Sequence, residues 1–319
     1  MPSFDVTVDL DSISASTTDK VITIIQLIYG IPSFLLMILF FFFFSCSKNY
    51  SNSFYRLVQL DLLTNILCYF NAWITLRLEN HEAGVKILKS IESTVPGAID
   101  WTSRAMIFFL HMQFCSTIAL NFHRISSVLF YAHYEKFWTR FYSIYGMICP
   151  IYSTLQMLYS GKFYHLEIIS NGSFTASYST EAGTRAMNLA ALFSTVYFLL
   201  LLIMIPLSVF LVSRKLKNLL FHDPGVSKKL TKIALTYCTL AAGILLWSIL
   251  NALDAIILWQ PEFLNANRHI ILLFCSDMMT LALPYILLIH DANVRREVMG
   301  LFAKRTDNGI TQVSSFVNQ

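Results

Sequence analysis

Apolar positions gather into seven long stretches along this 319-residue chain, and short polar segments separate them. The stretches cover residues 21–45, 55–76, 101–125, 141–160, 188–213, 231–257 and 269–290. Each has about 20 residues or more, enough for a helix to cross the ~30 Å hydrocarbon core of a bilayer. Helices and strands of soluble domains are usually shorter. The pattern therefore predicts an all-α fold, a seven-transmembrane helix bundle.

The composition agrees with a membrane protein. The chain is 55 % hydrophobic and 13 % charged, whereas soluble domains have about 25 % charged residues. Its net charge of +4 is small, and the basic residues lie at the ends of the stretches. A nucleic-acid-binding protein would instead gather them into one patch. We therefore expect a lipid bilayer, and no nucleic acid, as the surroundings of this chain.

Basic residues set the expected orientation. With the N-terminus outside, 15 Lys and Arg lie on the cytoplasmic side and 8 on the other, out of 23. Cytoplasmic segments of membrane proteins carry this excess. We expect an extracellular tail over 1–20, the bundle over 21–290 and a cytoplasmic tail over 291–319.

The beginning of the cytoplasmic tail has its own pattern. Val294, Val298, Leu301 and Phe302 recur at helical spacing, with arginine and lysine between them. Such a segment is typical of a short amphipathic helix in the inner membrane interface. In the second outer loop, Asn171-Gly172-Ser173 forms a glycosylation sequon.

Four classes of membrane protein compete for this pattern: receptors, transporters, channels and intramembrane enzymes. Transporters usually show paired halves with broken helices, and the number of stretches here is odd. No G-x-S-x-G turn occurs, and the histidines lie at scattered depths. We therefore expect no catalytic residue, metal or cofactor. A channel needs a filter loop or rings of charge. An oligomeric ligand-gated cation channel of seven-span subunits stays as the alternative, because assembly could form such a ring.

Basic residues near the cytoplasm favour the receptor. Arg124 ends the third stretch, where it either snorkels to the interface or forms a switch that contacts a G protein. The third inner loop is basic, which attracts anionic lipid and equally suits a G-protein docking surface. The candidate coupling residues are Arg124, Arg214, Lys215, Lys217, Lys228 and Lys229.

Four segments carry a resemblance to a known family. They are Asn52-Ser53-Phe54-Tyr55-Arg56-Leu57-Val58-Gln59, Asn121-x-x-Arg124-x-Ser126-Ser127, Lys229-Leu230-Thr231 and Pro284-Tyr285-Ile286-Leu287-Leu288. With these motifs, the chain resembles the nematode serpentine receptor class gamma chemoreceptors over nearly its whole length. The resemblance implies a chemosensory G-protein-coupled receptor at the plasma membrane, in the cilia of sensory neurons. It also implies a small-molecule ligand and a heterotrimeric G protein as partners.

Polar side chains within the stretches supply candidate sites, because in lipid they tend to face the bundle interior. A ligand is expected in the outer half of the bundle. The candidate ligand-binding residues are Trp73, Arg104, Phe108, His111, Trp247, Asn251, Asp254 and His269.

Each candidate also has a simpler interpretation. Arg104 either binds an anionic group or forms a surface pair with Asp100. His111 is either a ligand contact or a hydrogen-bonded interior histidine. Asp61, Asn65 and Asp277 are expected in an internal polar network. That network either holds ions and water or only joins the helices by hydrogen bonds.

Overall fold

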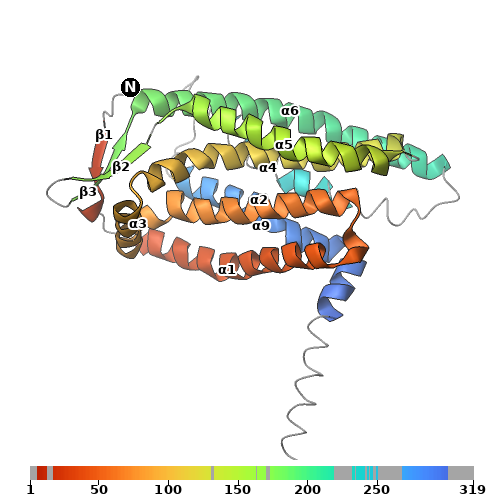
Figure 1. Cartoon of the computed structure of the whole chain (residues 1–319), viewed down its shortest axis with the longest axis horizontal. Helices are drawn as coiled ribbons and strands as arrows, with labels where there is room; N and C mark the ends of the chain where they lie inside the picture. The colour runs from red at the N-terminus through yellow and green to blue at the C-terminus, as the bar shows by residue number, and fades with distance from the viewer. Residues whose placement is uncertain are drawn as a thin grey trace, which may run out of the picture.

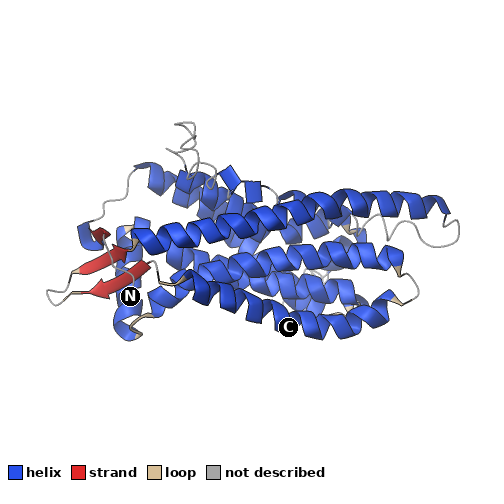
Figure 2. Cartoon of the chain, turned by 90° about the horizontal axis from the view of Figure 1, so that it is seen from above, coloured by secondary structure: helices blue, strands red, loops and turns tan. Residues whose placement is uncertain are grey.

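Long helices lie side by side in the computed structural model, with a small β-sheet at one end of the bundle (Figure 1). The view from above shows the same arrangement, with the strands gathered at that end (Figure 2). The structure describes residues 6–12, 17–130, 133–162, 164–169, 173–218, 232–233, 235–240, 243, 245–246, 249–250 and 268–300.

Six long helices correspond to six of the predicted stretches. They are α1 (Thr17–Cys46), α2 (Ser53–Leu76), α4 (Ala98–Leu129), α5 (Tyr134–Ser160), α6 (Thr180–Asn218) and α9 (Arg268–His290). The remaining stretch, 231–257, lies mostly outside the described residues, although 235–240 are helical.

Within the described part of the chain, five helices are long and apolar enough to cross a membrane. They are α1, α2, α4, α6 and α9. The 27 residues of α5 suffice in length, but tyrosine, serine and threonine dilute its apolar residues. The helical fold is thus confirmed, whereas the number of spans and the orientation stay predictions.

One end of the bundle carries structure that the sequence analysis treated as tail and loops; we call it the sheet end. Strands β1 (Val6–Asp9), β3 (Phe174–Tyr178) and β2 (Tyr164–Ile168) form an antiparallel sheet in that order. Val6 lies opposite Tyr178, so the N-terminal tail pairs with the segment before α6.

The sheet end also contains the short helix α3 (Glu82–Thr94), which lies between α2 and α4 in the sequence. Sheet and helix share a small apolar core. The residues of this core include Leu10, Val85, Leu88, Ile99, Leu166, Phe174 and Ala176. The strands have only four or five residues each, and β1 pairs with a strand more than 160 residues away, so local patterning did not reveal the sheet.

The opposite end, which we call the tail end, holds the predicted helix after α9. Residues 292–300 are helical. Asp291 Oδ1 caps this helix, since it accepts hydrogen bonds from the amides of Asn293 at 3.1 Å and Val294 at 3.2 Å. Val294 and Val298 are buried in the main apolar core. Leu301 and Phe302, also expected in the helix, lie outside the described residues.

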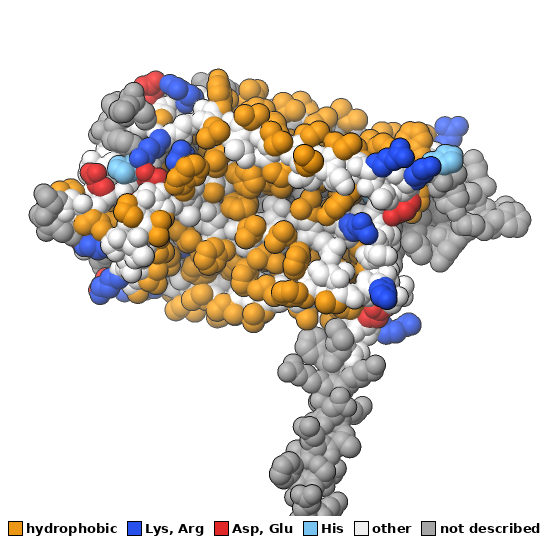
Figure 3. Space-filling model, in the orientation of Figure 1, with side chains coloured by type: hydrophobic (Ala, Val, Ile, Leu, Met, Phe, Trp, Pro, Cys, Tyr) orange, Lys and Arg blue, Asp and Glu red, His pale blue; other side chains and the backbone are white. Residues whose placement is uncertain are grey.

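Hydrophobic side chains cover the middle of the molecule on the face that Figure 3 shows, and charged side chains gather at both ends. Large apolar side chains are exposed along the helices, among them Ile28 at 69 %, Met147 at 67 % and Ile203 at 65 %. Soluble monomers rarely expose apolar surface over such an extent. This belt is the surface expected of helices that face lipid.

Candidate functional site

A buried ion pair joins α2 to α9 near the sheet end. Arg77, the residue that follows α2, places Nη2 2.5 Å from Oδ1 of Asp277, and the two side chains are 2 % and 4 % exposed. Arg77 Nε also donates a hydrogen bond to Gln26 Oε1 at 3.3 Å. The hydroxyl of Tyr29 donates to Asp277 Oδ2 at 2.5 Å. Together these four residues from α1, α2 and α9 form what we call the ionic cluster.

Aromatic rings complete the surroundings of Arg77. Its guanidinium lies 5.5 Å from the ring centre of Tyr69 and 5.2 Å from that of Trp73. At these distances the ring faces attract the cation. Arg77 Nη1 and Gln26 Nε2 are buried donors without a hydrogen-bond partner among the described residues. The ionic cluster can therefore donate further hydrogen bonds to an acceptor.

A second polar group, which we call the central network, lies deeper in the bundle. Asp61 on α2 accepts a hydrogen bond from Asn65 at 2.9 Å and one from the hydroxyl of Tyr237 at 2.9 Å. Gln113 on α4 donates to Asn65 at 2.7 Å and to Thr280 on α9 at 3.0 Å. All five side chains are buried. The network thus connects three described helices and residue 237.

Of the three residues predicted in one network, Asp61, Asn65 and Asp277, the contacts of the described residues bring two together. Asp61 and Asn65 do bond to each other, at 2.9 Å. Asp277 instead bonds to Arg77 and Tyr29. Asp277 lies three residues before Thr280, which belongs to the central network. Asp277 joins the ionic cluster instead, because Arg77 after the end of α2 supplies its basic partner.

At the sheet end of α4, Asp100 and Arg104 do not form the carboxylate–guanidinium pair that was one of the two interpretations of Arg104. The carboxylate of Asp100 binds Lys162 Nζ at 2.6 Å and lies 2.9 Å from His165 Nδ1 on β2. The guanidinium of Arg104 lies 4.4 Å from the ring centre of Trp101, and within the described residues its hydrogen bond goes from Nε to the Asp100 carbonyl at 3.4 Å. Asp100 therefore ties the sheet to α4, and Arg104 is held at the rim.

His111 is a hydrogen-bonded interior histidine in this structure. Its Nδ1 lies 2.9 Å from the hydroxyl of Tyr197 on α6, which in turn lies 2.8 Å from the hydroxyl of Tyr152 on α5. The ring of Phe193 contacts the imidazole edge to face at 5.2 Å. His111 is 2 % exposed. It therefore faces α5 and α6.

The expected ligand residues thus divide among separate surroundings. Trp73 belongs beside the ionic cluster, Arg104 beside Trp101, and His111 beside Tyr197. Trp73 and Phe108 are both partly buried against the main apolar core. Other expected site residues fall outside the described ones, or have only their backbone described. They are Trp247, Asn251, Asp254, Asn171, Lys228, Lys229, and, with backbone only, His269, Lys215 and Lys217.

The tail end holds a third polar group. Ser53 at the start of α2 binds Glu135 at the start of α5, through its amide at 2.8 Å and its hydroxyl at 2.7 Å. The same hydroxyl lies 2.8 Å from His123 Nε2 on α4. Arg124, next in sequence, is 3 % exposed. Its side chain is therefore inside the bundle. The snorkelling interpretation would require the guanidinium to reach the surface, and it does not. Arg214 on α6 is exposed.

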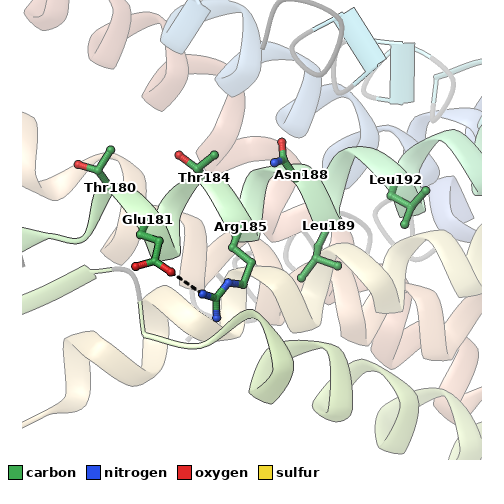
Figure 4. A pocket seen from close by; sticks show the side chains of 7 residues that line it. All are labelled: Thr180, Glu181, Thr184, Arg185, Asn188, Leu189 and Leu192. Atoms are coloured by element: carbon green, nitrogen blue, oxygen red, sulfur yellow. Dashed lines mark hydrogen bonds and ion pairs between the residues drawn. The ribbon is translucent and has the colours of Figure 1, made fainter. Parts of the chain in front are cut away.

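An open groove follows the first turns of α6 at the sheet end (Figure 4). Glu181 and Arg185 form an exposed ion pair there, 2.8 Å apart. The lining residues are Thr180, Glu181, Thr184, Arg185, Asn188, Leu189 and Leu192. The two charges of the groove pair with each other, and no second helix of the described chain closes over it, so the groove offers neither an unpaired charge nor an enclosure for a small-molecule ligand.

Several residues of these groups are not among the predicted site residues: Gln26, Tyr29, Arg77 and Tyr237. Their signal was present, because each is a polar residue within a stretch or at its end. Tyrosine is also common at the membrane interface, so position along the chain did not separate inward from outward side chains.

Comparisons with known proteins agree with this architecture. The family model described as "Srg family chemoreceptor" matches residues 23–298. The chain is 37 % identical over 276 residues to "Serpentine receptor class gamma-47" of Caenorhabditis elegans, which covers 86 % of this chain and 89 % of that protein. It is 31 % identical over 278 residues to "Serpentine receptor class gamma-53" of the same organism, covering 86 % and 90 %. The resemblance predicted from the motifs is thereby confirmed.

Proposed function

The chain belongs to the Srg family of chemoreceptors, and from this premise we propose that it is a chemosensory G-protein-coupled receptor. A small-molecule cue binds in the outer half of the bundle, and the inner end activates a heterotrimeric G protein. The sheet end is extracellular in this proposal and the tail end cytoplasmic. The receptor has seven spans and acts at the plasma membrane of sensory cilia.

The buried ion pair of Arg77 and Asp277 is the observation that carries the ligand site. Ionisable residues inside a membrane bundle are costly, and they mark functional sites by default. Asp277 is nine residues from the start of α9, or about 14 Å along the helix. The pair therefore lies in the half of the bundle next to the sheet end, where a ligand would arrive from outside.

The ligand lies between Trp73 and Phe108, which line the same apolar core from α2 and α4. Ligand pockets are mostly apolar and use few polar anchors. Trp73 also contacts Arg77, so a ligand against its ring comes within reach of the ionic cluster. His111, Arg104, Trp247, Asn251, Asp254 and His269 extend the proposed pocket.

Coupling is proposed at the tail end. Arg124 is buried beside His123, whose partner Ser53 connects α2, α4 and α5. Parting of these helices would expose the guanidinium to a G protein. The exposed Arg214, with Lys215, Lys217, Lys228 and Lys229, would add the basic docking surface. The central network lies between the two ends and would transmit the change.

A ligand screen on the purified chain in lipid nanodiscs tests this function, with ligand-dependent nucleotide exchange on a purified Gα subunit as the readout. We expect Arg124→Ala to abolish exchange and to change ligand affinity only modestly. Arg185→Ala, which removes a charge from an exposed pair, is the control and should signal normally. Ligand-evoked current in bilayers without G protein would instead support the ligand-gated channel. A tag at residue 1 that antibodies reach only after the cells are permeabilised would place the N-terminus inside and reverse the proposed orientation.

A further inference from the structure

An open groove with a volume of about 420 Å³ lies on the tail end of α5. Its lining residues are His133, Lys136, Phe137, Arg140, Phe141 and Ile144. They recur at spacings of three and four, so they lie on one face of the helix. We propose that this groove binds the headgroup of an anionic phospholipid, whose acyl chains follow the apolar face of α5.

The charge of the groove suits a phosphate. Lys136 and Arg140 are exposed, and neither forms an ion pair with a carboxylate within the described residues. Glu135 is adjacent in sequence but is engaged by Ser53, at 2.8 Å and 2.7 Å. One end of the groove also lies at the first turn of α5, where the helix dipole is positive. Both the two basic side chains and the helix dipole therefore attract an anion.

The floor of the groove suits a lipid. Phe137 and Phe141 stack with their ring centres 5.3 Å apart and their planes at 15°. Next to them begins a line of exposed apolar side chains that runs toward the sheet end. Ile144 is 50 % exposed, Met147 67 %, Ile148 58 %, Ile151 58 % and Leu155 59 %.

The length of this line distinguishes the occupant. From Arg140 to Leu155 the helix rises about 22 Å, more than the ~15 Å depth of one leaflet. Acyl chains held below the two basic residues would therefore contact apolar protein over their full length. A free phosphate or an acidic peptide would contact the charges and the rings, and it would gain nothing from this apolar face. The combination of cations, stacked rings and continuous apolar surface thus favours a phospholipid.

Native mass spectrometry of the full chain in mixed micelles tests the proposal. The micelles contain equal amounts of phosphatidylglycerol and phosphatidylcholine, and the ratio of the two bound lipids is measured. In the double variant Lys136→Ala/Arg140→Ala we expect affinity for phosphatidylglycerol to fall about 30-fold, as estimated for two basic residues at an anionic surface. Lys136→Arg/Arg140→Lys should keep the preference.

The double variant Lys48→Ala/Arg296→Ala is the matched control. It removes the same charge from exposed positions at the same end of the bundle, and it should leave the ratio unchanged. If the alanine variant fails to fold, Lys136→Gln/Arg140→Gln replaces it, because this variant removes both charges and keeps unbranched polar side chains.

Three outcomes would overturn the proposal. One is an unchanged ratio in the site variant, and another is an equal fall in the control. In the third, millimolar glycerol 3-phosphate displaces phosphatidylglycerol, which would show that the site takes a free phosphate. None of these outcomes bears on ligand recognition or on nucleotide exchange, so the proposed receptor function is tested separately.

Discussion

Arg77 and Asp277 form an ion pair across 200 residues of sequence, with 2.5 Å between Nη2 and Oδ1. Neither residue has an opposite charge beside it in its own helix, and each is buried. The pair therefore exists only because α1, α2 and α9 meet at this level. It is the most direct link between the architecture and the proposed ligand site.

Breaking this pair should destabilise the protein strongly. Arg77→Gln or Asp277→Asn alone should each lower the free energy of unfolding by about 3–5 kcal/mol, because an uncompensated charge stays buried. The double variant should lose less free energy of unfolding than the sum of the losses in the two single variants. Denaturant unfolding in detergent measures all the free energies of this double-mutant cycle. Arg185→Gln, in an exposed pair with Glu181, should cost about 0–1 kcal/mol. Additive losses at 77 and 277 would show that the two residues act independently.

The pocket prediction concerns two aromatic residues. Trp73→Ala and Phe108→Ala should each weaken ligand binding by about tenfold or more, because burying a large apolar side chain is worth about 1.5–3 kcal/mol. Trp101→Ala is the control, since Trp101 is 56 % exposed. Affinity is measured with the ligand found by the exchange screen. An unchanged affinity in both core variants would place the pocket elsewhere.

The central network should contribute to stability through Tyr237. Its hydroxyl donates to both oxygens of Asp61, at 3.1 Å and 2.9 Å. Tyr237→Phe keeps the ring and removes this donor, so we expect a loss of about 1 kcal/mol in the free energy of unfolding. Tyr159→Phe is matched in chemistry, but Tyr159 is 69 % exposed, and this variant should be neutral. Equal stability of both variants would mean that the hydrogen bonds contribute nothing net.

The sheet end should loosen in acid. Asp11 accepts the amide of Phe174 at 2.9 Å and binds Lys89 Nζ at 3.2 Å. These two contacts hold the pKa of Asp11 below its ordinary value. A lowered pKa in the folded state means that its stabilising contribution is present above the unfolded value, about 3.9, and is lost as pH falls through the folded value.

Hydrogen exchange tests this dependence at the Phe174 amide. After correction for the intrinsic rate, protection should fall as the pH drops below about 3.9 toward the lowered folded pKa of Asp11. In Asp11→Asn the fall should disappear, because the side chain no longer titrates. A pH-dependent loss that persists in this variant would assign it to another group.

Gly84 should tolerate no side chain. A Cβ at this position in α3 would lie 2.0 Å from the carbonyl oxygen of Leu78, which is backbone and cannot turn away. Gly84→Ala should therefore lower the free energy of unfolding by about 1–3 kcal/mol. Gly183→Ala in α6 has no atom within 4 Å of the new Cβ. It should be neutral or stabilising by up to ~1 kcal/mol. The same measurement in detergent compares them.

The sequence by itself determined the long helices, although not the short helix α3. Hydrogen bonds of a helix close within four residues, so hydrophobic runs and spacing along the chain suffice to predict where helices form. Six predicted stretches correspond to α1, α2, α4, α5, α6 and α9, and residues 292–300 form the expected helix after the last stretch. The motifs also identified the family, which the comparisons confirm.

Only the tertiary structure decided which polar side chains meet. Val6 pairs with Tyr178, and Arg77 with Asp277, across intervals in which local periodicity carries no information. A partner depends on how each helix is rotated and on how far its end reaches, and both are fixed by the packing of all helices at once. For this reason Asp277 joined Arg77 at the sheet end, while Asp61, in the same kind of apolar helix, joined the central network with Tyr237.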